Sequence, residues 1–298
     1  MTETWPTRSG NPPRRYYGIT PWTVLDASSG PWQTRKKHLA AMIDDGAGRD
    51  HINLYTGKHN LKGGMSRFDP VLADCMYEWY APHGGTVYDP FSGGPTRGII
   101  ATQHDLTYTG RDINPAQVEA NRRQAHALGI TGATWEVGDA LTPAPHAAFD
   151  MILTCPPYHH LERYTDNPRD LSNMTWAQHL DALHQVAHQC HSALADDRFL
   201  AWVTGDLRDR HGHQRSLPEH TLHALLDAGF HHINTHILVT PVGTRYLNLR
   251  RGWTHTRSAG RRHEHIYVMC KGDRRQATDI INNGYRERGY TYPDISRS

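Results

Sequence analysis

The feature that most limits the fold of this chain is a regular alternation of short β-like runs and amphipathic helical runs between residues 86 and 271. The pattern predicts strands at 86–91, 106–113, 133–137, 149–154, 198–205, 232–239 and 263–271, and helices at 95–104, 115–128, 176–194 and 218–229. Such alternation predicts an α/β fold with a mainly parallel sheet covered by helices on both faces. The last two strands follow one another without a helix, so we expect them to pair antiparallel at one edge.

Three segments are predicted along the 298 residues. Residues 1–64 are rich in Pro, Gly, Arg and aromatic residues and predict an irregular N-terminal arm with one helix at about 33–42. Residues 65–273 predict one α/β domain, which begins with an amphipathic helix at 68–80. Residues 274–298 predict a C-terminal tail. A hydrophobic content of 37% suffices for one sizeable core.

Composition and cysteine spacing exclude several classes of protein. No run approaches the roughly 18 apolar residues that a membrane span needs, and no apolar signal-peptide core is present, so we expect a cytoplasmic protein with no membrane partner. The four cysteines lack Cys-x-x-Cys spacing, which predicts reduced thiols and no metal site. We expect Cys75, Cys190 and Cys270 to face inward and to be structural.

Basic residues are concentrated in two stretches, although the net charge is only +2. No acid occurs between Ala228 and His263, whereas six arginines do: Arg245, Arg250, Arg251, Arg257, Arg261 and Arg262. The N-terminal stretch holds Arg8, Arg14, Arg15, Arg35, Lys36 and Lys37. Aromatic residues such as Trp22 and Trp253 are interleaved with them, a combination that suits a nucleic-acid backbone with bases stacked nearby.

Acidic residues stand at or just after the ends of the first three predicted strands of the domain. Asp89 opens a glycine turn, Asp89-Pro90-Phe91-Ser92-Gly93-Gly94, which leads into a helix. Asp112, followed by Ile113, ends the second strand at the position from which a carboxylate reaches ribose hydroxyls in dinucleotide folds. Asp139, followed by Ala140, comes after the third strand, where it could accept a hydrogen bond from an adenine amino group.

The fourth strand ends in Thr154-Cys155-Pro156-Pro157-Tyr158. The order DPFSGG, GRDINP, GDA and TCPPY resembles the S-adenosylmethionine-dependent DNA methyltransferases that act on base amino groups. In addition, FDPVLADCMYEW, GGTVYDPFSGGPTRGIIA and CPPYHHLERYTDNPRDLSNM resemble the DNA methylases of actinobacterial viruses and their hosts. The resemblance extends from about Phe68 to Lys271.

This resemblance implies a Rossmann-like, seven-stranded sheet with an antiparallel edge strand, as in class I methyltransferases, and S-adenosylmethionine as the cofactor. It implies that Asp89 to Gly94 contact the methionine end of the cofactor, Asp112 the ribose and Asp139 the adenine, and that Ile113, Ala140 and Thr154 also belong to the cofactor-binding residues. The implied partner is double-stranded DNA with the target base flipped out, and a homodimer is possible. The order of the motifs favours N6 of adenine over N4 of cytosine.

In the family, the residue at position 155 is usually Asp, Asn or Ser. It accepts one N–H of the target amine, the carbonyl of the first proline (Pro156) accepts the other, Pro157 stiffens the turn, and the aromatic residue (Tyr158) stacks on the flipped base. A protonated thiol is a weaker acceptor, so the role of Cys155 is open. It is either a substitute that keeps amine chemistry or, with Glu162 as the nearest acid, the nucleophile of a cytosine-C5 methyltransferase. The further alternatives are a silent nucleic-acid binder and methylation of an RNA base or another amine.

Target recognition is expected to fall to the arm 1–64, the loop 159–174 and the basic loop 243–262. In the loop 159–174, Arg163 and Arg169 are available to phosphates, and His159 and His160 suit contacts to bases or phosphates better than metal binding. Because no large insert is present, we expect a short target sequence or modest specificity.

Overall fold

The computed structural model of the protein describes residues 19–40, 43, 53–55, 60–62, 68–146, 148–241 and 252–287. The structural statements below concern these residues, and for 53–55, 60–62 and 285–287 they concern the backbone alone. Much of the predicted arm, residues 243–251 of the basic loop and the last residues of the predicted tail therefore lie outside the described part of the chain.

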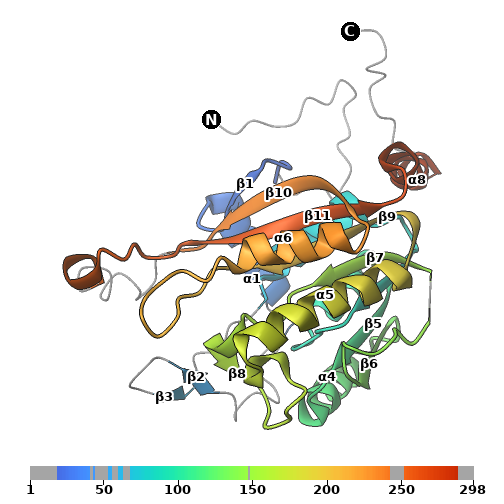
Figure 1. The fold of residues 1–298 in the computed structure, drawn as a ribbon. Coiled ribbons are helices and arrows are strands. Elements are labelled where there is room, and N and C mark those ends of the chain that lie inside the picture. The colour runs from blue at the N-terminus through green and yellow to red at the C-terminus, as the bar shows by residue number, and fades with distance from the viewer. Residues whose placement is uncertain are drawn as a thin grey trace, which may run out of the picture.

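An eight-stranded sheet forms the centre of the molecule, with the strand order β1-β10-β11-β9-β7-β4-β5-β6 (Figure 1). The strands are β1 (Val24–Asp26), β4 (Thr86–Asp89), β5 (Thr107–Asp112), β6 (Ala133–Val137), β7 (Phe149–Thr154), β9 (Leu194–Thr204), β10 (His231–Val239) and β11 (His263–Lys271). Strands β9, β7, β4, β5 and β6 are parallel to one another, and β11 is antiparallel to both β9 and β10. This topology confirms the predicted Rossmann-like, mainly parallel sheet, with eight strands in place of the expected seven.

The edge of the sheet next to β10 differs from the prediction. The antiparallel pair β10–β11 does not end the sheet, because β1 adds to β10 in parallel and the Ile237 N–H donates to the carbonyl of Thr23. Leu25 of β1 is buried, so the added strand also covers apolar surface. A second, small sheet joins β2 (Asn53–Tyr55) to β3 (Asn60–Lys62) and to β8 (Glu162–Arg163).

Helices cover both faces of the large sheet. One buried cluster takes side chains from α1 (Gly30–Ala40), α2 (Pro70–Tyr80), α3 (Thr96–Gln103), α4 (Pro115–Ala127) and α8 (Arg274–Glu287). The other takes them from α5 (Trp176–Ala193) and α6 (Leu217–Asp227), which lie across the face seen in Figure 1. Two short 3-10 helices, η1 (His159–Leu161) and η2 (Leu171–Asn173), follow β7. In the described ranges, no helix combines the length and the apolar composition that crossing a bilayer requires.

Local capping explains where α2, α4 and α5 begin. Asp69 accepts the Val71 N–H at 2.9 Å before α2, and Asn114 accepts the Ala116 N–H at 3.0 Å before α4, each followed by proline at the first helical position. Thr175 and Gln178 form a capping box at the start of α5. Each cap satisfies backbone donors that the first turn of the helix leaves unpaired.

Both segments that flank the predicted domain contribute to its core. Trp32 and Leu39 of α1 are buried, and the Trp32 indole N–H donates to Asp69 at 3.2 Å. Residues 274–287, predicted as part of a tail, form α8, whose Ala277 and Ile281 are buried in the same cluster. These two residues are one helical turn apart, so they present one apolar stripe to the sheet. Cys75, Cys190 and Cys270 are buried free thiols, as predicted.

Candidate functional site

The strands β4, β5, β6, β7 and β9 end at the same side of the sheet, which we call the carboxyl edge. Because β11 is antiparallel to β9, its first residues lie at this edge too, with His265 opposite Thr204. In open α/β sheets, ligands bind beyond the carboxyl ends of the strands. The four predicted residues Asp89, Asp112, Asp139 and Thr154 all lie here, at or just after a strand end.

Asp89 is the buried centre of the glycine turn. Its side chain is 0% exposed, and Oδ1 accepts the Phe91 N–H at 3.1 Å and the Thr154 hydroxyl at 3.0 Å. Oδ2 accepts Arg97 Nε at 2.5 Å and the Tyr108 hydroxyl at 2.9 Å. The Asp89 carboxylate therefore anchors the turn from inside. The cofactor contact that the resemblance implies for Asp89 stays a prediction, because both carboxylate oxygens already accept hydrogen bonds within the protein.

Arg97, on α3, is a part of this site that sequence reasoning missed. Its side chain is 5% exposed, and Nη2 donates to the carbonyl of Phe91 at 2.6 Å. Burial alone would lower the pKa of Arg97, but the neighbouring Asp89 carboxylate raises that pKa above its ordinary value, so the side chain stays charged. Nothing in the local sequence distinguishes Arg97 from a solvent-exposed arginine.

The rest of the turn has a fixed backbone and one unsatisfied hydroxyl. Gly93 has a φ of 50°, a left-handed conformation that favours glycine, and its N–H donates to Asp112 Oδ2 at 2.8 Å. Asn121 Nδ2 donates to the carbonyl of Gly93 at 2.7 Å. Ser92 is buried, and its Oγ has no hydrogen-bond partner within the described structure. Pro90 and Gly94 are buried, whereas Phe91 is half-buried.

Asp112 connects the glycine turn to the end of β5. Besides the Gly93 N–H it accepts the Asn114 N–H through Oδ1 at 2.8 Å, while both Asp112 and the next residue, Ile113, are half-buried. The second predicted acid is therefore joined to the first predicted motif by a hydrogen bond.

Asp139 lies beyond the end of β6 and contacts the loop that follows β7. Its Oδ1 accepts the Leu141 N–H at 2.8 Å, and its Oδ2 forms an ion pair with Arg169. Ala140 is buried, and Arg111 supports this segment by donating to the carbonyl of Pro143 at 2.8 Å. The carboxylate predicted to meet an adenine amino group is paired with an arginine in this structure.

The Cys155 to Tyr158 turn follows β7, with Pro156 buried and Pro157 half-buried. Cys155 Sγ lies 3.6 Å from the Tyr158 hydroxyl oxygen, and that hydroxyl donates to Glu264 Oε1 at 3.4 Å. The Arg261 guanidinium lies 5.7 Å from the centre of the Tyr158 ring. Sequence reasoning missed Glu264, and it singled out Arg261 only as part of a basic stretch.

Burial raises the pKa of Cys155 to about 12, although the positive charge of Arg97 acts in the opposite direction. The side chain is therefore a thiol at neutral pH. Covalent attack on a pyrimidine requires a thiolate, so this environment disfavours the nucleophile interpretation and favours Cys155 as a neutral polar group. Glu162, the acid considered for cytosine-C5 chemistry, is buried and accepts the Tyr164 hydroxyl at 2.6 Å.

Thr154 connects the two motifs that the sequence separates. Through Asp89, its hydroxyl joins the Cys155 to Tyr158 turn to the glycine turn, and Gly93 joins the glycine turn to Asp112. Asp139 is linked instead to Arg169. The structure thus brings most of the predicted residues into one connected arrangement and leaves Asp139 at its margin, beneath the loop 159–174.

His159 and His160, predicted to suit nucleic-acid contacts, differ in their surroundings. His159 is 7% exposed and has a φ of 51°, and its Nε2 lies 2.9 Å from the carbonyl of Met174. Because it is buried and contacts Met174 at the other end of the loop, His159 helps to hold the loop in place, and the expected contact to a base or phosphate stays a prediction. His160 is exposed.

A pH-dependent contribution to stability is expected from His179, which lies beneath the same loop. It is fully buried, Nδ1 lies 3.2 Å from the carbonyl of Leu171, and Nε2 has no partner in the described structure. Burial lowers the pKa of His179 to about 4 from an ordinary 6.5. Between these values the unfolded chain binds a proton that the folded chain does not, so stability falls as the pH decreases from 6.5 to 4, by about 2–4 kcal/mol in all.

We therefore expect His179→Gln to flatten the pH dependence of urea unfolding between pH 7 and 4.5. His223→Gln, at an exposed position of α6, is the control and should show the same pH dependence of urea unfolding as the wild-type protein. Equal slopes in the wild-type and His179→Gln proteins would contradict this account.

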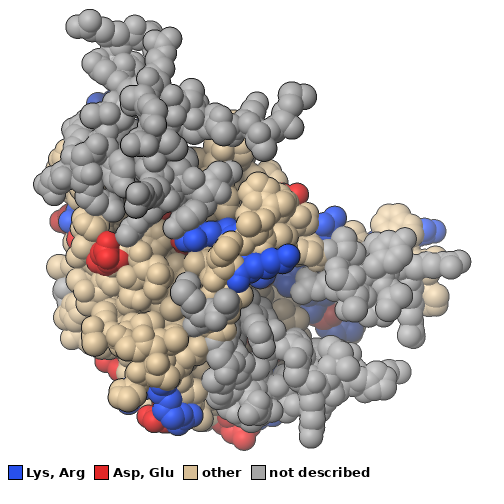
Figure 2. All heavy atoms as spheres, turned by 180° about the vertical axis from the view of Figure 1, so that it is seen from behind, with Lys and Arg blue, Asp and Glu red and all other residues tan. Residues whose placement is uncertain are grey.

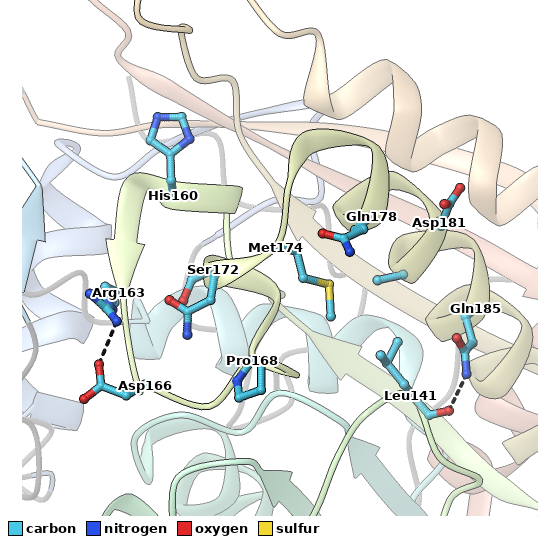
Figure 3. Close-up of a pocket in the computed structure, with 12 residues that line it drawn as sticks. Leu141, His160, Arg163, Asp166, Pro168, Ser172, Met174, Gln178, Asp181 and Gln185 are labelled. Atoms are coloured by element: carbon cyan, nitrogen blue, oxygen red, sulfur yellow. Dashed lines mark hydrogen bonds and ion pairs between the residues drawn. The ribbon is translucent and has the colours of Figure 1, made fainter.

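A cavity with a volume of about 830 Å³ lies between the loop 159–174 and α5 (Figure 3). It is lined by Leu141, His160, Arg163, Asp166, Pro168, Ser172, Asn173, Met174, Gln178, Asp181, Ala182 and Gln185. Arg163 and Asp166 form an ion pair across 2.7 Å at one side. No predicted catalytic or cofactor-binding residue lines this cavity. The candidate site at the carboxyl edge is therefore separate from this cavity.

The basic residues that are described have mixed roles. Arg35 and Lys36 form ion pairs with Asp74 and Asp69, each across 2.8–2.9 Å, so both contribute to the packing of α1 on α2. On the face shown in Figure 2, Lys and Arg side chains form small separate groups among uncharged residues. Arg257 lies 5.7 Å from the Trp253 ring, which is 50% exposed. The described part of the basic loop thus combines a cation with an exposed aromatic ring.

No family model and no curated protein matches this sequence. Among solved structures, the chain resembles TrmN from Thermus thermophilus at 18% identity and a TM-score of 0.49, over 68% of this chain and 49% of that one, about half its length. It also resembles a TehB-like SAM-dependent methyltransferase from Corynebacterium glutamicum (16%, TM-score 0.42, 80% of this chain and 96% of that one). A third is a putative methyltransferase from Bacillus halodurans (13%, TM-score 0.47, 69% and 99%). At this level of similarity, no conclusion about cofactor or substrate follows.

Proposed function

We propose that this protein transfers a methyl group from S-adenosylmethionine to an exocyclic amine of a DNA base, N6 of adenine in the first place and N4 of cytosine in the second. The observation that carries the proposal is the 3.0 Å hydrogen bond from Thr154 to Asp89, which places the Cys155 to Tyr158 turn beside the glycine turn. Methyl transfer needs its donor and its acceptor amine side by side. Thr154 and Asp89 are 65 residues apart in the sequence, and their hydrogen bond holds the two motifs next to each other, which supports the proposal.

The residues around the glycine turn have the chemistry that S-adenosylmethionine requires. Asp112 offers a half-buried carboxylate for ribose hydroxyls, and Ile113 offers apolar surface beside it. The Ser92 hydroxyl, within the turn, is a buried polar group that has no hydrogen-bond partner in the described structure. When bound, the cofactor supplies a methyl group on a positively charged sulfonium. We therefore assign Asp112, Ile113 and the turn from Asp89 to Gly94 to the cofactor.

The Cys155 to Tyr158 turn suits a flipped base. Neither Pro156 nor Pro157 has an N–H, so neither competes with the amine for the Pro156 carbonyl. Tyr158 is half-buried and its ring provides a stacking surface, with the Arg261 guanidinium 5.7 Å from the ring centre. Because a base inside a duplex cannot reach such a pocket, the DNA must be bound with the target base flipped out.

Transfer of a labelled methyl group tests the substrate class. The protein is incubated with labelled S-adenosylmethionine and, separately, with double-stranded DNA, RNA or free nucleosides, and we expect label in the DNA. Tyr158→Leu should transfer about 10- to 100-fold more slowly, since it loses base stacking. Tyr158→Phe, which keeps an aromatic ring, should lose less. Label in RNA alone, or in no nucleic acid, would contradict the proposed substrate.

A further inference from the structure

Glu264 lies near the beginning of β11, on the strand beside the end of β9. Since β11 is antiparallel to β9, residue 264 stands at the carboxyl edge, with the next residue, His265, opposite Thr204. In turn, β9 pairs with β7 through Trp202 and Thr154, directly before Cys155. The sheet topology therefore brings a carboxylate from the far end of the sequence to the Cys155 to Tyr158 turn.

The side chains of Cys155, Tyr158 and Glu264 form a row of thiol, phenol and carboxylate. The Tyr158 hydroxyl lies 3.6 Å from Cys155 Sγ and 3.4 Å from Glu264 Oε1. The three residues are each half-buried. Gly205, which follows β9, permits this arrangement, because a Cβ there would lie 3.1 Å from the Tyr158 ring.

Among these three side chains, the Glu264 carboxylate provides the acceptor oxygen that the Cys155 thiol lacks. A neutral thiol is a weak hydrogen-bond acceptor, whereas a carboxylate is a strong one and can also bind a proton. A base amine is a weak nucleophile because its lone pair is delocalised into the ring, so its reaction depends on acceptors for its two N–H groups. The Pro156 carbonyl accounts for one of them, and Cys155 is poorly suited to the other.

We propose that Glu264 is a catalytic residue that accepts the second N–H of the target amine and then takes up its proton, in place of the acceptor that Cys155 does not provide. This proposal rests on the proposed function. In the step, the amine nitrogen forms a bond to the methyl carbon, and the carbon–sulfur bond breaks with its electron pair remaining on sulfur. The nitrogen then loses one proton to the Glu264 carboxylate, which releases it to water.

Removing the carboxylate at position 264 and then introducing one at position 155 tests the proposal. We expect Glu264→Ala to lower kcat about 10- to 100-fold, the range of a lost hydrogen bond to a charged group. Glu264→Gln should fall between it and the wild type, because an amide oxygen accepts a hydrogen bond and cannot take up the proton. Adding Cys155→Asp to Glu264→Ala should raise kcat at least about tenfold over that of Glu264→Ala alone, since a carboxylate is again available to the amine.

Two controls separate chemistry from folding and binding. Affinity for DNA with 2-aminopurine at the target position, measured by fluorescence, should change less than about threefold in both Glu264 variants, because the proposal concerns the reacting amine. Glu119→Gln, at an exposed position of α4, is the matched control for loss of a carboxylate and should keep wild-type kcat.

The outcomes distinguish this proposal from the proposed function. If the wild-type protein methylates an amine and Glu264→Ala does so at the wild-type rate, the role of Glu264 is overturned and the proposed function stands. The role of Glu264 is also overturned if both Glu264 variants are folded and the kcat of Glu264→Ala does not rise when Cys155→Asp is added. The proposed function stands in that case too. If the wild-type protein methylates no amine, both proposals fail.

Discussion

Arg97→Met is expected to lower the free energy of unfolding by about 3–5 kcal/mol. The substitution keeps an unbranched side chain but removes the cation that neutralises Asp89, whose carboxylate is 0% exposed. A buried carboxylate without its partner either keeps a charge in an apolar environment or takes up a proton, and both cost free energy. Chemical denaturation at pH 7, followed by circular dichroism, measures the change.

The matched control is Arg123→Met on α4. Arg123 pairs with Glu119 across 3.4 Å, and both side chains are more than half exposed, so its loss should cost less than about 0.5 kcal/mol. Replacing Asp89 as well, in Asp89→Asn with Arg97→Met, should cost less than the sum of the two single changes, because no unpaired charge remains. Equal costs for Arg97→Met and Arg123→Met would contradict the structural role of the Asp89–Arg97 pair.

Asp112→Ala is expected to weaken binding of S-adenosylmethionine about 100-fold, which corresponds to about 2.7 kcal/mol. It removes the carboxylate assigned to the ribose hydroxyls and also the acceptor of the Gly93 N–H, which shapes the glycine turn. Asp112→Asn keeps an oxygen for Gly93 and loses the charge, so its effect should be smaller. Isothermal titration calorimetry with S-adenosylmethionine measures both variants.

Asp181→Ala is the control for this experiment, because Asp181 lines the 830 Å³ cavity beside α5 (Figure 3). Its effect on binding should stay below about twofold, as expected of an exposed side chain that the ligand does not touch. Wild-type affinity in Asp112→Ala together with a large loss in Asp181→Ala would place the cofactor in the cavity and would overturn the assignment of the glycine turn.

Local sequence determines most of the sheet. The predicted bounds of β6, β7 and β11 agree with the structure, because each run is followed by a residue or pair that interrupts pairing: Gly138, Cys155-Pro156 and Gly272. Strand β9 begins at Leu194 rather than at Arg198, since a bulge in its pairing with β7 admits the polar residues between them. Strand β1 and helix α8 were not predicted, because three residues are too few for a period and α8 has few apolar side chains.

The predictable part of the site is the part that lies in contiguous motifs. The glycine turn and the Cys155 to Tyr158 turn each follow a recognisable strand, so their meeting at one edge follows from the parallel topology. The contacts to Arg97 and Glu264 depend on tertiary packing. Glu264 is 106 residues from Tyr158, and the antiparallel course of β11 decides that the two side chains meet. No local pattern carries that information.

The position of the transferred methyl group tests the central claim most directly. DNA incubated with the protein and labelled S-adenosylmethionine is digested to nucleosides, which are then separated and identified by mass spectrometry. Label in N6-methyladenine, or in N4-methylcytosine, is the result that the thiol form of Cys155 and the acceptor oxygens around it predict. Label in 5-methylcytosine, with a covalent complex on DNA containing 5-fluorocytosine, would contradict it and would make Cys155 the nucleophile.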